Sequence, residues 1–67
     1  MTELDIWRSA DALMKRYGAG AVFIAALRAD EFLARGDARG CTVWAKITLA
    51  IDSLQRRQNP REGETMN

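Results

Sequence analysis

Few side chains in this 67-residue sequence can act as acids, bases or nucleophiles, because it contains no histidine and a single cysteine, Cys41. Acid–base chemistry would therefore depend on carboxylates or on Lys15, Lys46 and Tyr17. A zinc site is not expected either, since one thiolate and no imidazole cannot complete a set of four ligands. We expect no catalytic residue, no metal site and no cofactor, and hence a protein that is not an enzyme.

Asp30 and Glu31 are adjacent carboxylates, the arrangement closest to a catalytic pair. Neighbouring residues on a helix point about 100° apart, so these two side chains cannot readily share a proton. We interpret them as a solvated edge, in which Glu31 pairs with Arg35 one helical turn later.

Cys41 is the strongest candidate nucleophile, because it falls in the first turn of a predicted helix, where the helix dipole favours a thiolate. No base is predicted nearby, however, and the carboxylate of Asp37 opposes thiolate formation. We therefore predict that Cys41 is a small, partly buried packing residue.

The stretch LARGDARGCTVW at residues 33–44 contains two glycines around an aspartate, which suggests either a phosphate-binding loop or a joint between helices. A Walker-type loop needs a lysine and a hydroxyl after its second glycine, whereas Cys41 follows Gly40, and Asp37 would repel a phosphate. Gly36 instead suits the end of one helix and Asp37 the start of the next. We predict a joint, with Gly40 allowing close approach of Trp44 or Phe32; an anion site at the helix start is the alternative.

Three predicted helices, over residues 2–17, 21–35 and 38–57, position these side chains. Thr2 is a suitable cap for the first helix and Gly18 a suitable end. Each helix has an apolar stripe at helical spacing. The stripes consist of Ile6, Trp7, Ala10, Leu13, Met14 and Tyr17; of Val22, Ala25, Ala26, Ala29, Phe32 and Leu33; and of Gly40, Trp44, Ile47, Ile51 and Leu54. The sequence thus predicts an all-α fold: a small three-helix domain over residues 1–57, with the second and third helices forming an antiparallel hairpin.

Residues 58–67 have no apolar periodicity and contain the only proline of the sequence. Such a segment cannot bury enough apolar surface to offset the entropy of ordering, so we predict a disordered tail.

The chain is short for a stable monomer, since a domain of this size buries only about 60% of its unfolded surface. Small domains usually gain stability from disulfides, metals or a partner chain. One cysteine excludes an internal disulfide, so self-association is the natural remaining source of burial.

A cytoplasmic location is expected from three features. The longest uncharged apolar run, residues 19–27, is too short to span a bilayer. The first residues alternate charged and apolar side chains, unlike a signal peptide. A lone cysteine is compatible with a reducing compartment.

One set of residues recurs along most of the chain as possible family markers: Trp7, Gly18, the pair Gly36–Asp37, Gly40, Trp44 and Ile47. On these markers, residues 6–55 resemble a family of short bacterial helical proteins of unknown function. It implies a helical fold and transfers no functional residue.

Nucleic-acid binding is one possible function, because the helix over residues 38–57 directs Arg39, Thr42, Lys46 and Ser53 outward. The net charge of +1 and the acidic Asp37 and Asp52 on the same segment argue against it.

The two tryptophans, Trp7 and Trp44, are a possible ligand-stacking pair. Each lies on a predicted core stripe, however, so we expect both to be largely buried. Exposure of both indoles to water would contradict these stripes and reopen the stacking role.

Protein–protein interaction is the function that the sequence favours. Phe23, Leu27 and Ala34 form a second apolar stripe on the helix over residues 21–35. Leu49 falls among outward residues of the next helix. We expect Phe23, Leu27 and Leu49 to bind a partner chain, most simply a second copy. The alternative is that the first helix wraps over Phe23 and Leu27 and hides them within the monomer.

Overall fold

The computed structural model describes residues 2–58 of the chain, which form three helices linked by short turns. Helix α1 spans Glu3–Tyr17, α2 spans Ala21–Ala34 and α3 spans Ala38–Gln58, with a 3₁₀ turn, η1, over Gly18–Gly20. The predicted all-α fold is confirmed, and each predicted helix differs from the observed one by a single residue at one end. The predicted tail lies outside the described residues, except for Gln58, which is the last residue of α3.

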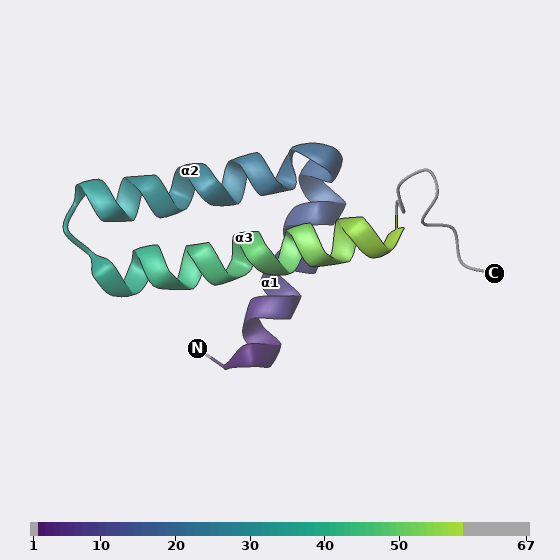
Figure 1. Cartoon of the computed structure of the whole chain (residues 1–67), viewed down its shortest axis with the longest axis horizontal. Coiled ribbons are helices and arrows are strands. Elements are labelled where there is room, and N and C mark those ends of the chain that lie inside the picture. The colour runs from purple at the N-terminus through teal and green to yellow at the C-terminus, as the bar shows by residue number, and fades with distance from the viewer. Residues whose placement is uncertain (1, 59–67) are drawn as a thin grey trace.

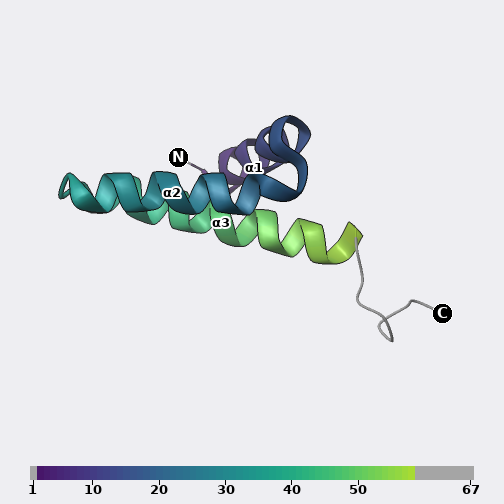
Figure 2. The same ribbon diagram turned by 90° about the horizontal axis from the view of Figure 1, so that it is seen from above.

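Helices α2 and α3 lie side by side as the predicted antiparallel hairpin, and α1 crosses one face of it (Figure 1). Seen from above, α1 lies on one side of the α2–α3 layer, near the start of α2 and the end of α3 (Figure 2). The other half of the hairpin, which contains the α2–α3 turn, therefore extends beyond α1 as a two-helix arm.

Helix α1 is closed at both ends by local interactions. The backbone N–H of Asp5 donates to Thr2 Oγ1 and the backbone N–H of Thr2 donates to Asp5 Oδ2, each at 3.2 Å, which is a reciprocal capping box. Gly18 ends the helix with φ of 58°, a conformation that glycine adopts at little cost. The side chain of Gln55 donates to the Gly18 carbonyl at 3.1 Å and so ties α3 to the end of α1.

The turn between α2 and α3 is a helix end followed directly by a helix start, as predicted. Gly36 has φ of 78°. The backbone N–H groups of Gly36 and Asp37 donate to the carbonyls of Leu33 and Phe32, at 3.0 and 2.9 Å, which is the Schellman pattern. Asp37 then caps α3, because its Oδ1 accepts from the backbone N–H of Gly40 at 2.9 Å. Gly36 and Asp37 thus reverse the direction of the chain between α2 and α3.

This turn can be tested by substitution. Gly36→Val is expected to lower the free energy of unfolding by more than about 1 kcal/mol, because valine is strained at positive φ. Asp37→Ala is expected to cost about 0.5–2 kcal/mol through loss of the cap. Thermal unfolding followed by circular dichroism measures both, and unchanged melting temperatures would contradict this description of the turn.

The core is small and rich in alanine. Its buried residues are Ile6, Ala10, Ala21, Ala25, Ile47, Ala50 and Ile51. They come from α1 and from the parts of the hairpin that α1 crosses, which are the first half of α2 and the middle of α3. Small side chains allow the three backbones to approach closely, and Ile47 and Ile51 fill the space between them.

Three residues of the predicted core stripes are exposed, so their assignment to the core is wrong. Leu33 is 63% exposed, and Trp7 and Tyr17 are exposed to 38% and 41%. Leu33 lies on the arm that α1 does not reach. Trp7 lies at the margin of the contact between α1 and α3, while Trp44 is half-buried and packs against the core.

Gly40 makes the close approach that its place on the stripe predicted. A Cβ atom there would lie only 2.5 Å from Cδ1 of Phe32, so the phenyl ring of α2 occupies the space that a larger residue would need. Of the two aromatic neighbours proposed for this glycine, Phe32 is therefore in direct contact.

The predicted Glu31–Arg35 ion pair is also wrong. Glu31 pairs with Arg28 at 3.3 Å instead, and the guanidinium of Arg35 lies over the ring of Phe32, 5.4 Å from its centroid. Both pairings are on the surface, where they contribute little to stability.

Candidate interaction surfaces

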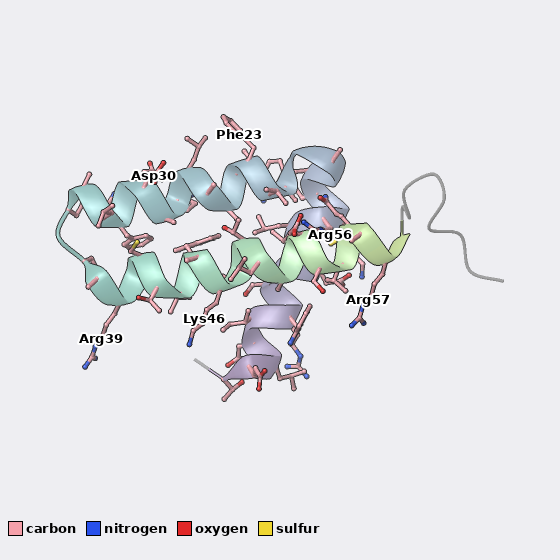
Figure 3. All side chains as sticks on the ribbon, in the orientation of Figure 1. Phe23, Asp30, Arg39, Lys46, Arg56 and Arg57 are labelled. Atoms are coloured by element: carbon pink, nitrogen blue, oxygen red, sulfur yellow. The ribbon has the colours of Figure 1, made fainter. Side chains whose placement is uncertain are left out.

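The side chains that could support catalysis are spread over the surface. Asp30 and Glu31 are exposed, and Asp30 points away from α3 (Figure 3). Cys41 is half-buried, as predicted for a packing residue. Within residues 2–58, His, Cys, Asp and Glu side chains nowhere gather in groups of three or more that could hold a metal ion.

The outer face of α2 carries two large apolar side chains, Phe23 and Leu27, which we call the α2 ridge. Phe23 is 65% exposed and Leu27 is 44% exposed. They lie one helical turn apart, on the side of α2 opposite the buried Ala21 and Ala25. Phe23 points away from α3 (Figure 3). Helix α1 therefore does not wrap over this face. The ridge is open to solvent, as predicted from the second apolar stripe.

The α2 ridge is bounded along the helix by a charged residue. Asp30 follows Leu27 by one turn on the same outer face, and the exposed Ala34 continues that face toward the end of α2. The apolar part of the surface is thus about one and a half turns long, which suits contact with a single helix.

Leu49 lies on a different surface from the α2 ridge. It is 70% exposed and lines a groove between α1 and α3 together with Lys46, which points away from α2 (Figure 3). Phe23 points in the opposite direction, from the other edge of the hairpin. The structure therefore brings Phe23 and Leu27 together and places Leu49 apart from them.

The α1–α3 groove has a volume of about 630 Å³. Its lining residues are Glu3, Ile6, Trp7, Lys46, Leu49, Ala50 and Ser53. Ile6 and Ala50 are buried and form an apolar floor, whereas Trp7 and Leu49 are partly open to solvent. The groove thus combines a buried apolar floor with the polar side chains of Glu3, Lys46 and Ser53.

Three basic residues follow the edge of α3 that faces away from α2. Arg39, Lys46 and Arg57 all point from this edge in Figure 3, and we call them the basic edge. Their spacings of seven and eleven residues are close to whole numbers of turns. Within residues 2–58, none of the ion pairs involves a residue of the basic edge. Asp52, the acid of α3, pairs with Arg56 at 3.1 Å.

Sequence reasoning identified Arg39 and Lys46 as outward residues but missed the groove that Trp7 lines. An apolar periodicity shows which side of α1 faces the rest of the molecule. It does not show where along the helix the neighbouring surface ends. The one available signal is that Trp7 is only the fifth residue of α1, since side chains near the end of a helix are less completely covered by neighbouring helices.

None of the helices in residues 2–58 combines the length and the apolar character needed to cross a membrane.

Comparison with known proteins finds no match to this chain among protein-family models, curated proteins or solved structures. The resemblance to short bacterial helical proteins therefore depends on the sequence markers alone.

Proposed function

We propose that this protein is a small cytoplasmic interaction module without catalytic activity, which binds a second copy of itself through the α2 ridge. The observation that carries the proposal is the exposure of Phe23 and Leu27 on the outer face of α2. Paired large apolar groups in water form the kind of patch that is typical of interaction sites.

Burying the α2 ridge against a partner chain would give a favourable free energy that is large for a chain of this size. Each fully buried phenylalanine or leucine side chain contributes about 1.5–3 kcal/mol. The internal core depends on four alanines and three isoleucines, so it holds little apolar volume. A partner chain would therefore add a substantial part of the total burial.

A symmetric pairing suits this ridge. In a two-fold arrangement the same patch is used on both subunits, so Phe23 of one α2 would lie beside Leu27 of an antiparallel second α2. The half-buried Ala26 beside the ridge would allow the two helices to approach closely. Asp30 would lie at the margin, where its carboxylate stays hydrated.

Sedimentation equilibrium of the full chain tests the proposal. The wild type is expected to show the mass of a dimer at high concentration, and the Phe23→Glu, Leu27→Glu double variant that of a folded monomer. Leu49→Glu is the matched control, because it places the same charge at an exposed leucine on the other edge. It should leave the dimer intact.

Two results would contradict the proposal. A wild type that remains a folded monomer at high concentration excludes self-association. A double variant that loses its helical circular dichroism, rather than dissociating, would show that the ridge residues stabilise the monomer itself.

A further inference from the structure

We propose that the α1–α3 groove and the basic edge of α3 together form a binding site for single-stranded nucleic acid. A base would stack on Trp7 in the groove, and the backbone phosphates would follow the basic edge. This site is independent of the α2 ridge, which lies on the opposite edge of the hairpin.

The groove can accept a flat apolar group. The indole of Trp7 is 38% exposed and lines the groove together with the buried Ile6 and Ala50. A base of single-stranded nucleic acid is free to leave its neighbours and stack on such a ring, whatever its sequence. The volume of about 630 Å³ is in the range of small-molecule sites and leaves room for one base with its sugar.

The charge distribution favours an anionic chain at this edge. Helix α3 carries four basic residues and one acid, with a second acid, Asp37, engaged as its N-cap, whereas α1 carries three of each. Because Asp52 is already paired with Arg56, it does not neutralise the basic edge. The near-zero net charge of the whole chain thus conceals a cationic surface on one helix.

The groove and the basic edge share Lys46, which makes them one site. Lys46 lines the groove, with Arg39 about 10 Å away along the helix axis on one side and Arg57 about 16 Å away on the other. A strand with one base stacked on Trp7 would therefore have a basic side chain near its backbone on each side of that base. Ser53, also in the lining, adds a hydroxyl that can donate to a phosphate.

Two features favour a single strand over a duplex. Stacking on Trp7 needs a base that is not held in a double helix. Three cations along a helix of this length are also too few for tight binding to the dense charge of a duplex. Glu3, the one acid of the lining, would repel a phosphate but can accept a hydrogen bond from a base.

Fluorescence anisotropy of a labelled oligothymidylate, titrated with the full chain at low salt, tests the site. Lys46→Glu is expected to weaken binding by roughly tenfold and to reduce the salt dependence, as loss of one phosphate contact does. Arg28→Glu on α2 is the matched control, since it changes the net charge equally on another surface. It should have at most about a twofold effect.

Stacking is tested separately through Trp7. In a Trp44→Phe variant, Trp7 is the only tryptophan, and its emission is expected to be quenched when the oligonucleotide binds. Trp7→Leu should weaken binding by at least about fivefold, given the usual contribution of a stacked base.

Four outcomes would overturn the proposal: no binding at low salt, equal losses for Lys46→Glu and Arg28→Glu, unchanged Trp7 emission in the bound state, or tighter binding to a duplex of the same length. The double variant of the α2 ridge should retain binding, so failure of the dimer and failure of this site are distinguishable.

Discussion

Replacing Ile51 by alanine is expected to lower the free energy of unfolding by about 2–5 kcal/mol, as buried isoleucine-to-alanine changes do. Ile51 is fully buried and lies in the cluster that joins all three helices. Its removal would leave a cavity in a cluster whose other buried members are four alanines and two isoleucines, and the alanines have no long side chains that can move in to fill it. For a domain of this size, such a loss is a large part of the total stability.

Leu49→Ala is the matched control for this substitution. Leu49 lies two residues away on the same helix and is 70% exposed. Its truncation should change the free energy of unfolding by no more than about 0.5 kcal/mol. Denaturant titrations should be made at one protein concentration, because self-association would add a concentration-dependent term. Equal effects at the two positions would contradict the helix packing described above.

Gly40→Ala is expected to destabilise the protein by about 1–3 kcal/mol, although alanine is the better helix former. The added methyl group would lie 2.5 Å from Cδ1 and 2.7 Å from Cγ of Phe32. Turning the ring about χ2 leaves Cγ in place, so relieving the overlap requires a different χ1 rotamer of Phe32 or a shift of the helices. The overlap therefore outweighs the helix propensity.

The sign of this effect should reverse when the ring is removed. In a Phe32→Ala background, Gly40→Ala is expected to stabilise the protein by about 0.5–1 kcal/mol, since only the propensity difference remains. Thermal or denaturant unfolding of the two single variants and the double variant completes the cycle. If Gly40→Ala has the same effect in both backgrounds, Phe32 is not the reason for the glycine.

The small core of this chain is related to the two proposed binding surfaces. An alanine-rich interior allows the helices to pack closely but leaves several large apolar side chains outside, Phe23 and Trp7 among them. In a larger domain these residues would be covered by further helices. Here they are available for a partner, which on one edge we propose to be a second copy and on the other an anionic strand.

The helices and their ends were predictable from the sequence because their causes are local. Thr2, Gly18, Gly36 and Asp37 act on backbone groups within a few residues of themselves, so the residue type and its position were enough. The apolar spacing of Ile47 and Ile51 likewise identified the buried side of α3.

The extent of each contact was decided only by the tertiary structure. Leu33 was placed on the same stripe as the buried Ala25, but eight residues of an α-helix turn it about 80° away from Ala25, to the edge of that stripe. It is exposed there, on the arm that α1 does not reach. Trp7 is partly exposed because it lines the open groove between α1 and α3. Periodicity specifies the direction in which a side chain points, whereas its burial depends on whether another helix passes there. The point at which α1 crosses the hairpin depends on how closely the alanines of the three helices allow their backbones to pack. Residues of all three helices determine it together, so it cannot be predicted from one segment.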